Sequence, residues 1–184
     1  MSGVRDPDRI SAIQSDGCRI RTGGLHAMLA DVAVAAASPA PQRGQRVAQA
    51  LLPYLGCPDL LDDASTRCCP DRYVRHLIHR GADYTVLSLV WTSGQMSPVH
   101  AHRAWCAFGL HQGTLVESFF GPDMTGAASQ GCLQHRVGDT GHSEPGQDGA
   151  HRLANLCIHK AVSIHVYGAR YDRLGDGVNQ IWAP

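Results

Sequence analysis

Apolar residues follow two different patterns along the chain, and the first pattern predicts helices. Residues 25–37 and 46–55 are rich in Ala, Leu and Val and read as two helices, which the Ser-Pro-Ala-Pro segment at 38–41 separates. Residues 1–22 are polar with little periodicity, and residues 59–70 predict a loop with room for a short helix. The N-terminal part is therefore expected to be a small helical unit.

From Tyr73 onward the pattern changes to short β-branched and aromatic runs, which predict strands. A turn is expected at residues 111–113, and the Gly-rich polar segment 121–149 predicts long loops. The strands that we expect lie at residues 84–91, 99–110, 113–120, 132–137 and 161–167. The pattern predicts a mainly β protein, a barrel or sandwich over residues 71–184 with a helical cover over residues 1–70, in one compact domain.

Composition favours a single-domain protein that binds neither nucleic acid nor a membrane. The 184 residues suit one domain, and 16 basic and 16 acidic side chains cancel, which argues against a nucleic-acid or membrane partner. No apolar run is long enough for a transmembrane helix, and the first residues do not resemble a signal peptide. The seven cysteines contain no C-x2-C pair, so reduced thiols and a cytoplasmic location are expected. We expect a monomer or a weak homo-oligomer.

The chain contains eleven histidines, a high number that makes histidine the first candidate for a metal ligand. Two of them are two positions apart in a predicted strand. His100 and His102 would project from one face of that strand and could present two imidazoles to one metal ion. An isolated H-x-H pair is often a harmless surface feature. Here the spacing G-x5-H-x-H-x3-C-x6-G resembles the first cupin motif, in which a glutamate usually stands where this chain has Cys106.

A third metal ligand is expected from a separate segment, because three ligands on one face need a second direction of approach. His151 and Asn155 match the H-x3-N end of the second cupin motif, although a solvated loop histidine would have the same local sequence. Together with His100 and His102, His151 would complete a neutral three-histidine site. The commoner oxygenase set is two histidines and a carboxylate, so a substrate thiolate could replace the missing anion.

A second polar pattern lies in the predicted strand at residues 161–167. Ser163, His165 and Tyr167 share one strand face, while Ile164 and Val166 share the other. Three polar groups facing a barrel interior must bond to one another, and an imidazole can bridge two hydroxyls. The alternative is a solvent-facing strand.

Tyr73 and Arg75 repeat the same-face spacing where the strand region begins. A guanidinium that lines a barrel needs an anion, and a substrate carboxylate would suit it. An ordinary surface arginine is the alternative.

These segments resemble the thiol dioxygenases of the cupin superfamily, which comprise cysteine dioxygenase and 3-mercaptopropionate dioxygenase. The resemblance extends from about residue 72 to residue 172, and four segments agree in order and spacing. They are residues 72–77 (RYVRHL), 97–102 (SPVHAH), 149–155 (GAHRLAN) and 163–168 (SIHVYG).

The resemblance implies a cupin fold, that is, a double-stranded β-helix or jelly-roll barrel. It implies that iron(II) is bound by His100, His102 and His151, and that Arg75, with Tyr73 nearby, binds a substrate carboxylate. It further implies that Ser163, His165 and Tyr167 form a catalytic relay. The implied reaction is oxidation of a small thiol by O2 to a sulfinate.

Three positions bear on which thiol is used. Cys106 falls where animal-type cysteine dioxygenases carry a cysteine that forms a thioether with the relay tyrosine, so a Cys106–Tyr167 crosslink is a hypothesis; a small buried thiol is the alternative. Gln95 resembles a glutamine of the mercaptopropionate-type enzymes, whereas Arg75 resembles the cysteine-type ones. The substrate therefore stays open between cysteine and a mercapto-acid.

Three rival functions remain. One is an iron cupin oxygenase that acts on cysteine or a related thiol in a biosynthetic pathway, with further oxidation or rearrangement, and whose segment 121–149 would reshape the pocket. Another is a metal-binding cupin sensor without turnover, which would have no reason to align Ser163, His165 and Tyr167. A zinc or nickel cupin isomerase is distinguished by metal content.

Overall fold

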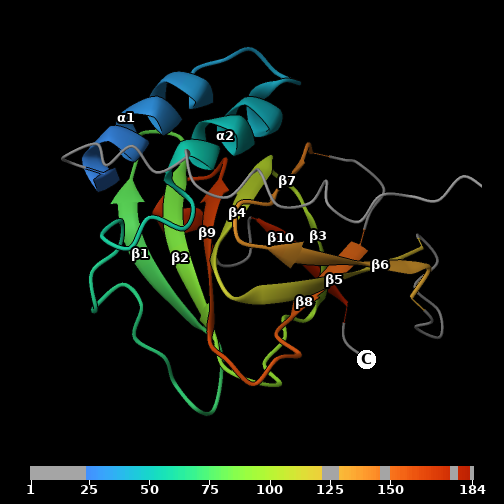
Figure 1. Ribbon diagram of the computed structural model, residues 1–184. Coiled ribbons are helices and arrows are strands. Elements are labelled where there is room, and N and C mark those ends of the chain that lie inside the picture. Colours follow the sequence, from blue (N-terminus) through green and yellow to red (C-terminus); the bar gives the residue numbers. More distant parts are fainter. Residues whose placement is uncertain (1–23, 122–128, 146–149, 175–177, 183–184) are drawn as a thin grey trace, which may run out of the picture.

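The computed structural model describes residues 24–121, 129–145, 150–174 and 178–182. Two helices and a short 3-10 turn come first, and strands dominate the rest of the chain (Figure 1). The helical elements are α1 (Gly24–Ala36), α2 (Arg43–Leu51), η2 (Leu52–Tyr54) and η3 (Tyr171–Arg173). The strands are β1 (Val74–Arg80), β2 (Thr85–Trp91), β3 (Val99–His102), β4 (Cys106–Gln112), β5 (Thr114–Phe120), β6 (Gly131–Arg136), β7 (Thr140–Ser143), β8 (Ala150–Ala154), β9 (Ala161–Tyr167) and β10 (Asn179–Trp182).

The strands form two five-stranded sheets, in the orders β1-β2-β9-β4-β7 and β10-β3-β8-β5-β6. Every strand pair within them is antiparallel. From β2 to β10 the chain crosses repeatedly between the sheets, and apart from the β5–β6 pair, strands that are neighbours in sequence lie in opposite sheets. This is the topology of a double-stranded β-helix, and the predicted fold class, mainly β with N-terminal helices, is confirmed.

Strands β2 and β9 lie next to each other in the first sheet and are buried along their whole length. Their alternate residues face different surroundings: Val86, Val162 and Ile164 pack in a cluster with the helices, and Leu87 and Leu89 pack in a cluster inside the barrel. This double burial explains why both strands are nearly continuous apolar runs, a pattern typical of strands covered on both faces.

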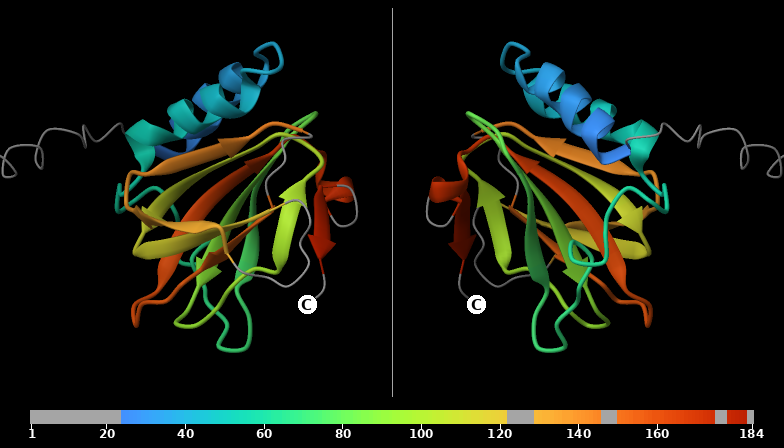
Figure 2. Two further views of the ribbon diagram at one scale, coloured as in Figure 1. Left: turned by 90° about the vertical axis from the view of Figure 1, so that its right-hand side faces the viewer. Right: turned by 90° about the vertical axis from the view of Figure 1, so that its left-hand side faces the viewer.

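The helices lie together on one side of the barrel, where α2 contacts β4 and β7 (Figure 2). Met28 and Val32 on α1, and Val47 and Leu51 on α2, are completely buried. The spacing of four residues in each pair places both members on one helix face. The helical cover thus closes the outer face of the first sheet and leaves the barrel interior free for chemistry.

The first predicted helix is confirmed, whereas the second has different bounds. It begins at Arg43 and ends at Leu51, and the expected last turn is the 3-10 turn η2. Pro53 lies in that turn, and a proline has no N–H to continue α-helical bonding. Residues 59–70 contain turns and no helix.

The predicted strand at 99–110 is wrong as a single element, because the chain changes sheets within it. β3 ends at His102 and β4 begins at Cys106; in the gap, the Arg103 N–H donates to the Val178 carbonyl and the Trp105 carbonyl accepts from the Gly168 N–H. The expected turn after β4 is confirmed at Gly113, whose φ of 77° favours glycine. Strands β1, β7, β8 and β10 lie outside the predicted strand ranges. Within the predicted loop segment 121–149, residues 122–128 and 146–149 lie outside the described residues, and the described part contains β6 and β7.

Candidate metal centre

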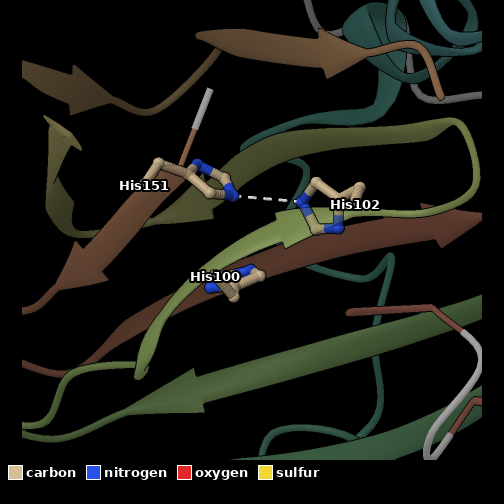
Figure 3. A group of neighbouring side chains, drawn as sticks. All are labelled: His100, His102 and His151. Carbon is tan, nitrogen blue, oxygen red and sulfur yellow. Dashed lines mark hydrogen bonds between the residues drawn. The ribbon is translucent and has the colours of Figure 1, made fainter. Parts of the chain in front are cut away.

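Three histidines from two adjacent strands meet inside the barrel. His100 and His102 lie on β3, His151 lies on β8, and His100 is the register partner of His151 (Figure 3). One ring nitrogen of each histidine lies within 4.8 Å of the corresponding atoms of the other two. The Nε2 atoms of His102 and His151 are 3.0 Å apart. The two distant sequence segments therefore converge on one point.

In two of these histidines the other ring nitrogen faces an oxygen that fixes the tautomer. The Nδ1 of His100 lies 3.0 Å from the Pro98 carbonyl, and the Nδ1 of His102 lies 2.9 Å from Oδ1 of Asn179. Because these oxygens accept, both Nδ1 atoms must donate, and each Nε2 keeps its lone pair. Nitrogen lone pairs that converge inside a buried site repel each other unless a cation lies among them. The donor set therefore fits a divalent metal ion.

Burial keeps the imidazoles of His100 and His102 unprotonated near neutral pH. Burial and the neighbouring His151 lower the pKa of His100 to about 4 and the pKa of His102 to about 3. A neutral imidazole is the form that binds a metal ion. Protons therefore compete little with a metal ion for these two ligands at pH 7.

Glu117 on β5 is the part of the centre that the sequence analysis missed. It is buried, and its Oε1 accepts from Nδ1 of His151 at 2.5 Å. Its Oε2 lies 2.8 Å from Nε2 of His135 on β6. Burial alone would raise the pKa of Glu117, but the hydrogen bonds from the two histidines lower that pKa to about 2. A buried carboxylate thus binds the outer nitrogen of His151 and is not itself in the three-histidine group.

A signal for Glu117 existed in the sequence. It shares strand parity with Leu115 and Phe119, so an acidic side chain stands on an otherwise apolar face. Asn179 gave no comparable signal, because the short strand β10 has no distinctive pattern.

The opposite sheet contributes the predicted polar chain. Ser163 Oγ lies 2.9 Å from Nε2 of His165, and the Tyr167 hydroxyl lies 3.4 Å from Nδ1 of the same ring. All three residues are buried, so the solvent-facing alternative is excluded. Burial lowers the pKa of His165 well below its ordinary value and raises the pKa of Tyr167. The imidazole is therefore neutral and the phenol keeps its proton at neutral pH.

Trp91 joins this chain to the arginine at the cavity rim. Its Nε1 donates to Ser163 Oγ at 3.0 Å, and its ring stacks on Tyr73 with centroids 4.5 Å apart. The Tyr73 hydroxyl accepts from Nη2 of Arg75 at 2.7 Å. The Arg75 side chain is solvent-exposed, and among the described residues it forms no ion pair with a carboxylate.

A cavity of about 400 Å³ connects these groups. The three histidines, Arg75 and the relay residues His165 and Tyr167 line it, with Cys106 and Tyr73. The His102 and Tyr167 rings are 5.9 Å apart between centroids, so the relay phenol lies beside the metal ligands. The cavity can therefore hold a small molecule that reaches from the metal position to the guanidinium.

Gln95, which the family resemblance predicts to be a substrate-binding residue, bonds to backbone groups at both ends of its side-chain amide. Its Nε2 donates to the Cys69 carbonyl at 2.8 Å, and its Oε1 accepts from the Thr92 N–H at 2.8 Å. It is not among the residues that line the cavity in the described part of the chain. Its amide therefore holds the preceding loop against the end of β2.

The model of a protein family described as cysteine dioxygenase type I matches residues 65–176. The match covers more than half of the chain and includes all the residues of this site except Asn179. Among solved structures, an uncharacterized conserved protein with a double-stranded β-helix domain from Klebsiella pneumoniae is 15% identical, with a TM-score of 0.49 over 66% of this chain and 94% of that chain.

Two further solved structures are similarly distant. A Cupin 2 conserved barrel domain protein from Salinispora arenicola is 16% identical, with a TM-score of 0.44 over 58% of this chain and 83% of that chain. Oxalate oxidase in complex with the substrate analogue glycolate is 15% identical, with a TM-score of 0.45 over 60% of this chain and 59% of that chain.

Replacing a metal ligand should abolish metal binding. We expect His100→Ala and His151→Ala to lose the bound divalent metal of the purified protein, because each leaves two imidazoles where three converge. Metal content per chain, measured by plasma mass spectrometry, checks this. His159→Ala, at an exposed histidine outside the cavity, should keep its metal. A His151→Ala protein with full metal content would remove that residue from the ligand set.

Proposed function

Because the chain belongs to the cysteine dioxygenase type I family, we propose that it is a non-haem iron(II) enzyme that oxidises the sulfur of a small thiol carboxylate with O2 to a sulfinate. The substrate that we propose is cysteine or a mercapto-acid. The observation that carries the proposal is the combination of groups along one cavity: three histidine nitrogens, His165 and Tyr167 of the Ser-His-Tyr chain, and an arginine without a carboxylate partner among the described residues.

A bound ferrous ion would supply the place where thiolate sulfur and dioxygen meet, held by His100, His102 and His151. The chain's own part is orientation. Arg75 would bind the substrate carboxylate, and its hydrogen bond to Tyr73 restricts the guanidinium to a few orientations. Since a carboxylate at the rim and a sulfur at the metal position fix both ends of a short molecule, the cavity favours thiols that carry a carboxylate.

The relay would hold a proton on the Tyr167 hydroxyl, next to the substrate. Tyr167 is a protonated phenol, so it can donate a hydrogen bond towards the substrate. A neutral His165 has one donor and one acceptor nitrogen, so its Nε2 can accept from the Ser163 hydroxyl while its Nδ1–H donates to the Tyr167 oxygen, which leaves the phenolic O–H free to donate to the substrate. Trp91 donates to Ser163 and thereby limits that hydroxyl to the orientations that serve His165.

We also propose that the protein acts in the cytoplasm. All six cysteines among the described residues are free thiols, the state that a reducing compartment maintains. No described helix is both long and apolar enough to cross a membrane.

The proposed reaction is tested by loading the protein with iron(II) under argon and measuring oxygen uptake with cysteine, 3-mercaptopropionate, mercaptosuccinate and cysteamine. We expect uptake with at least one of the thiol carboxylates and a sulfinate product that carries two atoms of labelled oxygen. Cysteamine, which lacks the carboxylate, should be the poorest substrate. The His151→Ala protein is the control. If none of the thiols supports oxygen uptake above that control, the proposal fails.

Substitution of Arg75 tests the carboxylate contact. Loss of about 1.5–3 kcal/mol of charge-assisted bonding in Arg75→Ala would raise KM for the preferred thiol carboxylate by roughly tenfold or more. Arg80→Ala is a matched control on the same strand, because that guanidinium lies over the Tyr171 ring at 4.3 Å. Steady-state kinetics on both variants measure the effect. Unchanged kinetics in Arg75→Ala would show that another group binds the carboxylate.

The register of β4 and β9 supports the proposed thioether between Cys106 and Tyr167. They are register partners on β4 and β9, and both are buried. Formation of the carbon–sulfur bond removes two hydrogens, with dioxygen as the oxidant at the iron-loaded site. After aerobic turnover we expect an intact mass two hydrogens below the sequence mass, absent in Cys106→Ser and retained in Cys132→Ser, which alters an exposed thiol. A wild-type mass equal to the sequence mass would exclude the crosslink.

A further inference from the structure

The three proposed ligands are neutral, but a buried anion lies directly behind one of them. We propose that Glu117 is a positioning residue of the metal centre: through His151 it provides the negative charge that the ligand set lacks, and His135 holds it in place. This inference rests on the proposed metal site and concerns residues that do not themselves contact the metal ion.

The strand register brings the three side chains together. Glu117 on β5 pairs with Leu153 of β8 and with Leu133 of β6, so His151 and His135 are its diagonal neighbours, two residues along each partner strand. Side chains on one face of adjacent strands can reach each other at this offset. The resulting order is His135, Glu117, His151 across three neighbouring strands, and the proposed metal position comes next after His151.

Both carboxylate oxygens are used by histidines, one each. Oε1 lies 2.5 Å from His151 and Oε2 lies 2.8 Å from His135. The side chains of Glu117 and His135 are 10% and 4% exposed, so water contributes little to their solvation. A carboxylate held at both oxygens cannot turn away from His151. It therefore orients that imidazole and also places a negative charge beside it.

A carboxylate that accepts from the far nitrogen of a ligating histidine makes the imidazole a stronger donor to the metal. His100 and His102 face neutral acceptors at the same position, a peptide carbonyl and an amide oxygen. His151 is therefore electronically different from the other two. The usual two-histidine, one-carboxylate oxygenase set places its anion on the metal; here the anion lies one imidazole further out, which leaves a coordination position for the substrate thiolate.

Phe108 lies between His135, which holds this carboxylate, and His165 of the proposed relay. The rings of Phe108 and His135 meet edge-on at a centroid distance of 5.0 Å, and the Phe108 ring also stacks on His165 at 5.4 Å. One aromatic side chain thus separates the two imidazoles. Because that side chain is apolar, it offers the carboxylate no competing donor, and both oxygens stay committed to His151 and His135.

The test compares Glu117→Gln with the wild-type apoprotein in a cobalt(II) titration followed by visible absorption. Glutamine keeps the size and can still accept from His151 through its amide oxygen, but it removes the charge. We expect cobalt affinity to fall by about 10–100-fold, the usual effect of losing an outer-shell partner. Asp83→Asn, which removes an exposed charge in the turn between β1 and β2, should bind cobalt as the wild type does. A cobalt affinity for Glu117→Gln equal to that of Asp83→Asn would overturn the inference.

A second readout separates charge from structural support. In the iron-loaded proteins, the ferric/ferrous potential of Glu117→Gln should be more positive than that of the wild type, because a nearby anion favours the more highly charged ion. A residue that only supports the fold would lower the unfolding temperature of the apoprotein and leave the potential unchanged, and that result would refute the proposed role.

His135→Leu gives an independent measurement if Glu117→Gln does not fold. It leaves the carboxylate in place but removes the donor at Oε2, so cobalt affinity should fall severalfold; wild-type affinity would show that His135 does not hold Glu117. The wild-type titration distinguishes the two proposals. A wild-type protein that binds no divalent metal would defeat the proposed function itself, whereas equal binding by wild type and Glu117→Gln would defeat only the role of Glu117.

Discussion

The antiparallel pairing of β3 with β8 is the contact on which the site depends. It sets His151 opposite His100, and the two-residue period of β3 adds His102 on the same face. A shift of one residue in this register would turn His151 away from the interior. The pairing is short, and β10 on one side and β5 on the other fix it within the sheet. Metal binding would reinforce the same register, so fold and site stabilise each other.

The two sheets divide the chemistry between them. The sheet that contains β3 and β8 carries the three proposed metal ligands, whereas β9 and β2 in the other sheet carry the proposed relay and Trp91. A molecule in the cavity would therefore contact one sheet through its sulfur and the other through hydrogen bonds. Because hydrophobic residues from both sheets pack in one interior cluster, the distance between the two groups of residues is a property of barrel packing rather than of any loop.

The sequence was sufficient to predict those elements whose residues follow a helical or strand periodicity. The helices, β2 and β9 have strong apolar patterns, and the H-x-H and Ser-His-Tyr spacings follow directly from the strand period. Prediction from the sequence failed where a contact between distant residues determines the local structure. The break between β3 and β4 occurs because the chain changes sheets, and Asn179 reaches His102 only through the β10–β3 pairing. The backbone partners of Gln95 at Cys69 and Pro70 cannot be inferred from spacing either.

The complete burial of β9 has a consequence for how this protein can change. Packed beneath helices on one face and around the cavity on the other, this strand cannot shift to accommodate a different ligand without disturbing the core. Adaptation to new molecules is then expected at the rim of the cavity, where the exposed Arg75 lies near the start of β1, an edge strand of its sheet. Divergent descendants would be expected to share the relay and differ at the rim.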